Sequence, residues 1–255
     1  MMVWTLLRRE LRETLRSPSL LASMLSLPVT VVGVPLILVL YLDSAAPEAT
    51  RLAIQQIYDL KSDDPTGLLV EAVAMAWLPI FLLMPVFLPI LLSAQSVGGE
   101  RERRTLEPLL ATPVSTTQIV LAKSLASVVP AVLLCWLSAA VFVGGLNLVA
   151  YRATQTLPLP DPSWAVGVGL LAPLLSIFGN AMAVAISARV RDPRAAQNLA
   201  AMTVVPLIGL GIAQLAGGIR LGLVFYLGWS AVLLLVDVAL VYLASALFDR
   251  ERLLR

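Results

Sequence analysis

Six long apolar stretches constrain this chain more than any other feature of its sequence. They lie near residues 20–42, 71–97, 119–150, 164–188, 199–218 and 221–247. A helix needs ~20 mostly apolar residues to cross a hydrocarbon core of ~30 Å, and each stretch is that long. With 59% hydrophobic and 13% charged residues among 255, too little polar surface remains for a soluble domain. The sequence predicts an all-α membrane protein, a single domain over 1–255 with six transmembrane helices.

The basic residues predict how these helices are oriented. Of the 18 lysines and arginines, all but Arg51, Lys61, Arg152 and Arg220 fall on the side of the amino terminus when six helices cross. Segments rich in Lys and Arg remain in the cytoplasm. We therefore expect a multi-pass protein of the cytoplasmic (inner) membrane with both termini cytoplasmic. Basic residues at this level face anionic membrane lipid, and the net charge of +2 indicates no nucleic-acid partner.

The first 19 residues predict an interfacial helix. At 100° per residue, one stripe contains Val3, Trp4, Leu7, Leu11 and Leu15, and the opposite side contains Arg9, Arg12, Glu13 and Arg16. Ser17-Pro18-Ser19 then ends the helix before the first span. A generic basic anchor explains this pattern as well as a specific role does.

Prolines interrupt the predicted second span. Pro79, Pro85 and Pro89 each remove a backbone donor, which predicts a bent or locally unwound helix. Irregular backbone is tolerated in a membrane only against protein or beside a water-filled path. The span is therefore either the wall of a conduit or a kinked, packed helix. Just before it, the run 63–67 indicates a turn.

A short cytoplasmic helix is predicted between the second and third spans. Thr105 can cap it, and Pro108 falls in its first turn, where the missing donor does no harm. Its exposed leucines would make a poor surface unless another protein covers them. The predicted partner site consists of Glu100, Glu102, Arg103, Thr105, Leu106, Glu107, Leu109, Leu110, Thr112 and Pro113.

A second cytoplasmic turn is predicted between the fourth and fifth spans. It contains Arg189, Arg191, Asp192 and Arg194. Asp192 before Pro193 favours a helix start, with the proline at the first helical position. The arginines contact either lipid phosphate, which we favour, or a partner protein.

Three polar residues lie within the predicted spans: Asp237, Asn180 and Gln214. A carboxylate at this depth costs ~2.5–3.5 kcal/mol on insertion scales, so Asp237 should face the bundle or be protonated. It is either a cation or proton site, with Asn180 or Gln214 beside it, or a structural hydrogen bond between helices.

Small residues predict close helix contacts in the later spans. They are Gly179, Ala183 and Ser187 in the fourth span, and Ala213 and Gly217 in the fifth. A stiff proline-rich linker precedes the fourth span and ends at Ser163, which we expect to cap the helix.

The residue inventory excludes several kinds of site. The sequence has no histidine and one cysteine, Cys135, so histidine bases, zinc-peptidase motifs, thiolate metal sites and an intrachain disulfide are impossible. Serine follows Lys61 and Lys123, but no glycine pattern leads into either, so the chain has no ATPase site of its own. We expect no catalytic residue and no metal.

The cytoplasmic segment resembles the signature of a transporter family. The run Gly99-Glu100-Arg101-Glu102-Arg103-Arg104-Thr105-Leu106-Glu107-Pro108-Leu109-Leu110-Ala111-Thr112-Pro113-Val114-Ser115, followed by Ile119 and Lys123, is similar to that of ABC-2 type permeases. These are the membrane subunits of one class of ATP-binding-cassette exporters. The resemblance extends over most of the chain, including the turn from 187 to 197, although Arg104 stands where glycine is usual.

The resemblance implies a complex. Two permease copies, identical or closely homologous, would pair above two cytoplasmic ABC ATPase subunits. The helix at 105–111 would be the coupling helix, and residues 3–16 the connecting helix. ATP and Mg would bind on the partner ATPase, and this chain would bind no cofactor. Two alternatives remain open: a secondary transporter that uses an ion gradient through Asp237, and a membrane scaffold that transports nothing.

Overall fold

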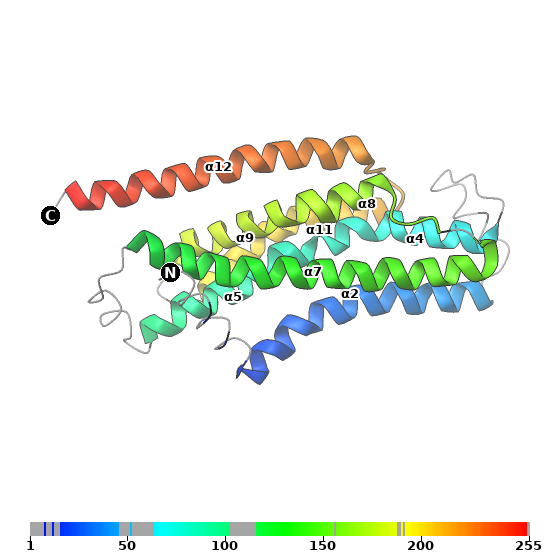
Figure 1. Cartoon of the computed structure of the whole chain (residues 1–255), viewed down its shortest axis with the longest axis horizontal. Helices are drawn as coiled ribbons and strands as arrows, with labels where there is room; N and C mark the ends of the chain where they lie inside the picture. Colours follow the sequence, from blue (N-terminus) through cyan, green and yellow to red (C-terminus); the bar gives the residue numbers. More distant parts are fainter. Residues whose placement is uncertain are drawn as a thin grey trace.

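The computed structural model describes residues 16–45, 64–102, 116–155, 157–187 and 192–253, with single positions at 8, 12, 52 and 190. This part of the chain contains helices and no strand. Figure 1 shows an elongated bundle whose helices run along one common direction. Among the described residues, six segments are long and apolar enough to cross a membrane, which confirms the predicted all-α class and the six transmembrane helices.

The helical elements, in chain order, are α2 (Pro18–Ala45), α4 (Pro65–Phe81), α5 (Leu83–Glu102), α7 (Thr116–Thr154), α8 (Pro162–Val166), the π-helix η1 (Gly167–Leu171), α9 (Ala172–Ser187), α10 (Pro193–Ala201), the 3₁₀-helix η2 (Met202–Val204), α11 (Val205–Leu215) and α12 (Leu223–Leu253). We name the two ends of the bundle by the helix ends that lie there. At the 102–116 end α5 ends and α7 begins, and at the 45–65 end α2 ends and α4 begins (Figure 1).

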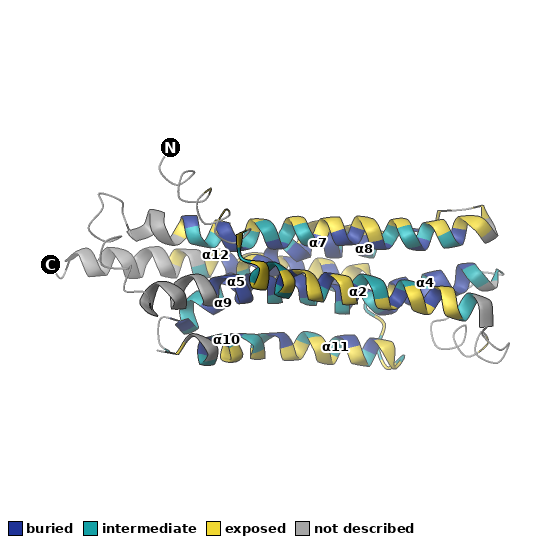
Figure 2. Cartoon of the chain, turned by 90° about the horizontal axis from the view of Figure 1, so that it is seen from below, coloured by how far each residue is buried: buried dark blue, intermediate teal, exposed yellow. Residues whose placement is uncertain are grey.

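The second span, formed by α4 and α5, is the centre of the bundle. Of its most apolar window 72% is buried within the chain, against 22% for the windows in α2 and α12. Figure 2 shows the same contrast between the buried inner helices and the exposed outer ones. The prolines interrupt this span at Leu82, which separates α4 from α5. The second span is therefore a kinked, packed helix in the part of the chain that the structure describes.

An aromatic cluster fills the core beside α4. The ring of Trp164 lies 5.3 Å from that of Phe81 and 5.1 Å from that of Phe142, measured between centroids. The indole N–H of Trp164 also donates to the carbonyl oxygen of Ala74 at 3.0 Å. This cluster joins α4, α7 and α8, because each of them contributes one ring.

Two helices begin earlier than the sequence predicts. α4 begins at Pro65, inside the run expected to be a turn, and the Asp64 carboxylate accepts from the N–H of Gly67 at 2.8 Å. α8 begins at Pro162, and the cap is Asp161, which accepts from the N–H of Ser163, so the predicted Ser163 cap is wrong. In both helices Asp caps and Pro fills the first position, where no N–H is needed.

The prediction from small residues is right at Gly179 and wrong at Gly217. A Cβ added to Gly179 would lie 2.6 Å from the carbonyl oxygen of Val86, so α9 and α5 meet closely there. Gly217 instead ends α11 with a φ of 72°. Its N–H donates to the Gln214 carbonyl at 3.0 Å, and that of Gly218 donates to the Ala213 carbonyl at 2.9 Å. This is a helix-terminating turn that favours glycine.

Candidate functional site

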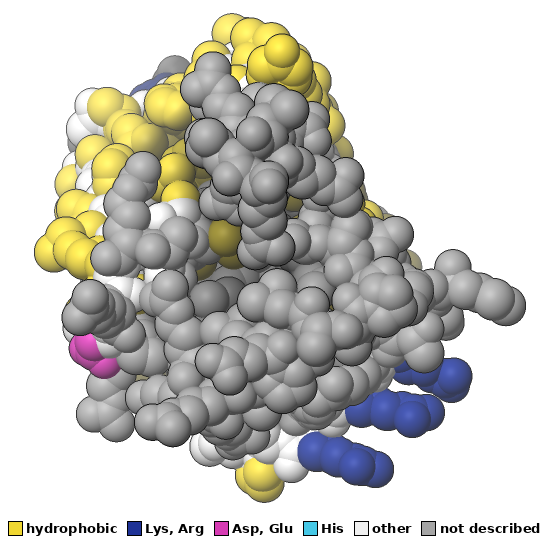
Figure 3. All heavy atoms as spheres, turned by 90° about the vertical axis from the view of Figure 1, so that its left-hand side faces the viewer, with side chains coloured by type: hydrophobic (Ala, Val, Ile, Leu, Met, Phe, Trp, Pro, Cys, Tyr) yellow, Lys and Arg dark blue, Asp and Glu magenta, His cyan; other side chains and the backbone are white. Residues whose placement is uncertain are grey.

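The first predicted site adjoins the 102–116 end. Glu100 and Glu102 belong to the last turn of α5. The remaining residues of this site, Arg103, Thr105, Leu106, Glu107, Leu109, Leu110, Thr112 and Pro113, lie outside the described residues. So does most of the predicted helix at 3–16, apart from Arg8, Arg12 and Arg16, which are exposed. Figure 3, which views this end, shows Lys or Arg side chains grouped along one edge.

The second predicted turn adjoins the same end. α10 begins at Pro193, as the sequence predicts, and the Asp192 carboxylate accepts from the N–H of Ala195 at 3.0 Å. Arg194 lies in the first turn of α10, whereas Arg189 and Arg191 lie outside the described residues. The aspartate therefore fixes where the chain re-enters the bundle.

The helices that flank these two segments form one packed set. α5 leads into the segment 103–115 and α7 leads out of it, while α9 and α10 flank the second turn. α5 is in contact with α7, α9 and α10, and α9 with α7 and α10. Both segments are therefore joined in the chain to the same group of packed helices.

A buried cluster of hydrogen bonds joins three of these helices. Ser93 of α5 donates to the side-chain oxygen of Asn180 on α9 at 2.6 Å, and Ser127 of α7 donates to the same oxygen at 3.0 Å. The two serine hydroxyls lie 2.9 Å apart. All three side chains are buried. We call these three residues the polar junction, and it links the two helices around 103–115 to the helix before the second turn.

The three polar residues predicted inside the spans do not form one site. Asn180 belongs to the polar junction. The side-chain amide of Gln214 on α11 donates to the Met75 carbonyl of α4 at 2.5 Å. Asp237 on α12 is 4% exposed, and neither carboxylate oxygen has a hydrogen-bond partner among the residues that the structure describes. The interhelical hydrogen bond offered as one alternative for Asp237 is thus not formed there.

Metal-binding groups are scarce in the described part of the chain. No group of three or more His, Cys, Asp and Glu residues there could hold an ion. Cys135 is a free thiol, fully buried in α7.

Sequence reasoning missed Ser93 and Ser127. Their positions along the helices offered a signal. Ser93 lies about as far before the end of α5 as Ser127 lies after the start of α7, so the two serines are at a similar depth in the bundle. Depth alone does not say which face of a helix a serine occupies, and only the packing shows that both meet Asn180.

Comparison with known proteins gives one finding. The family model described as ABC-2 family transporter protein matches residues 4–237. Neither the comparison with curated proteins nor that with solved structures gives a match. The matched range includes five of the six candidate spans found among the described residues, most of the sixth (Leu223–Leu240) and both predicted cytoplasmic segments. The chain therefore belongs to the ABC-2 family of transporter proteins.

Proposed function

We propose that the chain is the permease subunit of an ABC exporter, which moves its substrate out across the cytoplasmic membrane. A separate cytoplasmic ATPase would hydrolyse ATP, with ATP and Mg bound to that subunit and no cofactor bound here. Membership of the ABC-2 family and six apolar spans support this proposal. The 102–116 end and both termini would face the cytoplasm, in keeping with the distribution of basic residues.

The polar junction is the observation that carries the proposal. An ATPase that pushes on the segment 103–115 would move α5 and α7 together. Ser93 and Ser127 hold both helices to Asn180, so α9 would follow. Hydrogen bonds between helices resist separation in a bilayer because the lipid offers no replacement partner. The second turn after α9 would thus move in step with the first segment.

The predicted partner surface combines apolar and charged residues. Leu106, Leu109 and Leu110 would be buried in a groove of the ATPase, with Glu102, Arg103 and Glu107 at the rim. Stable interfaces have this composition, an apolar centre within a polar rim. A second copy of the permease, identical or closely homologous, would complete the transporter, and the arginines at the second turn would contact lipid phosphate.

A capture experiment tests the ATPase contact. The tagged chain would be crosslinked in cells, purified and assayed for ATP hydrolysis. Replacing Leu106, Leu109 and Leu110 together by Glu should abolish capture of the ATPase, whereas replacing all three by Met should preserve it. Leu157, which is exposed at the 45–65 end, supplies the matched control. Leu157→Glu should have no effect, and capture that survives the triple Glu variant would refute the proposed surface.

One observation favours a second candidate function. Asp237 is buried without a hydrogen bond among the described residues, as a group that binds a proton or cation from a gradient would be. Under this alternative no ATPase takes part, and Asp237→Asn abolishes transport. Under the exporter proposal, Asp237→Asn preserves ATPase capture and ATP-driven transport.

A further inference from the structure

Prolines inside α2 and α4 leave particular carbonyl oxygens without a helical donor. In an α-helix each N–H donates to the carbonyl four residues earlier, and proline has no N–H. Pro35 therefore leaves the carbonyl of Val31 without a donor in its own helix, and Pro79 does the same to the carbonyl of Met75. Inside a bilayer an unsatisfied carbonyl is costly, because neither lipid nor water can bond to it there.

Each of these two carbonyls accepts from a side chain of another helix. The indole N–H of Trp77 on α4 donates to Val31 of α2 at 2.8 Å. The amide of Gln214 on α11 donates to Met75 of α4 at 2.5 Å. In both pairs a proline on one helix is matched by an N–H donor on its neighbour.

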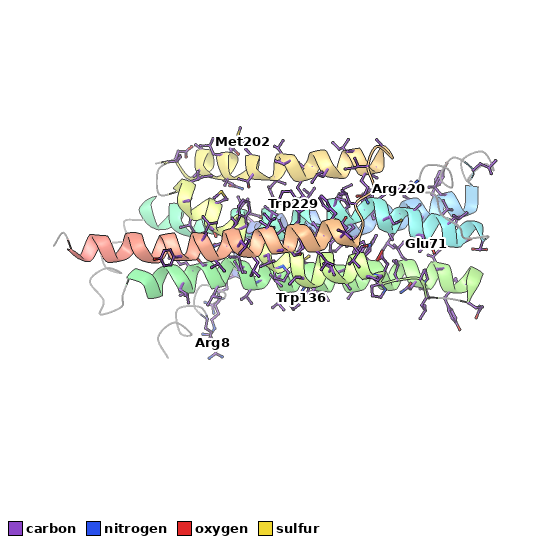
Figure 4. All side chains as sticks on the ribbon, turned by 90° about the horizontal axis from the view of Figure 1, so that it is seen from above. Arg8, Glu71, Trp136, Met202, Arg220 and Trp229 are labelled. Atoms are coloured by element: carbon purple, nitrogen blue, oxygen red, sulfur yellow. The ribbon has the colours of Figure 1, made fainter. Side chains whose placement is uncertain are left out.

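The π-helix η1 gives a third example. The N–H of Ala172 donates to Gly167 instead of Val168. The next residue that could serve Val168 is Pro173, which has no N–H. The indole N–H of Trp136 on α7 donates to the Val168 carbonyl at 2.9 Å, and Figure 4 shows where Trp136 lies. Three separate interruptions are thus satisfied in the same way.

We propose that Trp77, Trp136 and Gln214 are positioning residues. The side-chain N–H of each one binds a backbone carbonyl for which a nearby proline supplies no backbone N–H. Gln214 is the member with the largest consequence, because it binds the outer fifth span to the kinked central one. Through it, α11 and α4 would move as one unit. This inference goes beyond the proposed function, since it holds whichever energy source drives transport.

The packing one turn earlier on α11 supports the assignment of Gln214. A Cβ added to Gly211 would lie 3.1 Å from the side chain of Ile80 and 3.8 Å from that of Pro79. The glycine lets α11 approach the kink itself, and the Gln214 side chain is buried against it. Together they fix the rotation of α11 and leave Ile208 and Ile212 exposed on its other side.

An ordinary interhelical hydrogen bond is the competing explanation, and a double-mutant cycle separates the two. Gln214→Met keeps the shape of the side chain and removes its N–H donor. Pro79→Ala restores the backbone N–H that serves Met75. If Gln214 substitutes for the missing N–H, Pro79→Ala should rescue Gln214→Met. A bond that is unrelated to the proline would not be rescued.

Thermal unfolding of the purified full-length chain gives the measurement. Cys135 is the single cysteine of the sequence and is fully buried, so a thiol-reactive dye reports unfolding without further engineering. Gln214→Met should lower Tm by ~2–4 °C, the shift expected when a chain of this length loses one hydrogen bond between helices. In the Pro79→Ala background the same change should lower Tm by less than half as much.

Two controls keep the result decisive. Pro89→Ala alters the same span but restores a donor elsewhere, so it should not rescue Gln214→Met. Should Pro79→Ala fail to fold, the cycle of Trp77→Phe with Pro35→Ala applies the same test to the second pair. An equal loss of Tm with and without the proline, in the cycle that can be measured, would overturn the inference. The assay needs no ATPase, so this failure is distinct from failure of the proposed function.

Discussion

The second span and α12 are about equally hydrophobic, yet they occupy opposite places in the bundle. In its most apolar window the second span is 72% buried and α12 only 22%. In water such a difference would follow from hydropathy, because apolar residues avoid solvent. In a bilayer the lipid is as apolar as leucine, so hydropathy does not decide which helix is central.

The two spans differ in how closely other helices contact their backbone. Pro79 leaves the Met75 carbonyl of the second span without a helical donor, and this carbonyl accepts from Gln214; the neighbouring Ala74 carbonyl accepts from Trp164. It also lies against Gly179 of α9. Most of the large apolar side chains of α12 are exposed instead. The centre of this bundle is therefore distinguished by backbone carbonyls that need a donor from another helix and by small residues at close contacts, and less by apolar character.

The largest effect is expected when a methyl group is added at one glycine of each region. Gly179→Ala should cost about 2–3 kcal/mol of stability, because the added carbon would lie 2.6 Å from a backbone oxygen that cannot turn aside. Gly228→Ala on α12 has nothing within 4 Å and should be neutral or stabilising by up to ~1 kcal/mol. Reversible unfolding in mixed micelles measures both. Equal costs at the two sites would refute the contrast.

The second test removes a hydrogen bond from each region. Asn180→Leu should cost about 1–2 kcal/mol, because it removes the oxygen that accepts from both Ser93 and Ser127 in a buried site. Ser230→Ala on α12 should cost less than about 0.5 kcal/mol, since Ser230 donates only within its own helix, to Tyr226.

A rescue sharpens the test of the polar junction. Combining Asn180→Leu with Ser93→Ala and Ser127→Ala should recover much of the lost stability, because the two hydroxyls that donated to Asn180 are removed together with their acceptor. The same unfolding assay decides this. If the triple variant were less stable than Asn180→Leu alone, the hydroxyls would have a role apart from Asn180.

The third test concerns the acidic residue of α12. Asp237→Asn should change stability by less than about 1 kcal/mol, because it breaks no hydrogen bond among the described residues. A loss above ~2 kcal/mol would reveal a partner for the carboxylate, such as a bound cation or a second subunit. Measuring the variant in the presence and absence of added monovalent cations separates these two partners.

The smallest effect is expected on the outer face of α12. Val238→Ala removes carbons from a side chain that is 61% exposed, and in lipid this should cost less than about 0.5 kcal/mol. Leu88→Ala in α5, where the side chain is fully buried, should cost about 2–4 kcal/mol. Unfolding in the same micelles compares the two, and similar losses would mean that a partner covers this face of α12.

Much of the architecture could be predicted from the sequence. The apolar stretches predict the six helices, and Asp192 with Pro193 predicts the start of α10, because these features are local. The prolines of the second span predict its kink. The start of α4 was missed because Asp64-Pro65 suits a turn and a helix start equally well, and the choice between them depends on the residues after Gly67.

The pairings between helices could not be predicted. Asn180, Gln214 and Asp237 were grouped by residue type, yet Asn180 bonds to α7, Gln214 bonds to α4, and Asp237 has no hydrogen-bond partner among the described residues. A single span shows which residues share a face, but not how that face is rotated toward the other five. That rotation depends on packing across the whole bundle.

The match between Pro79 and Gln214 has a consequence for how such chains change over generations. Loss of the glutamine is harmful while the proline remains, and the proline is harmful once the glutamine is gone. Drift at either position is therefore conditional on the other, although the two lie in different spans. Related sequences that keep the proline should therefore also keep the glutamine, whereas those that have lost the proline are free to vary at the glutamine position.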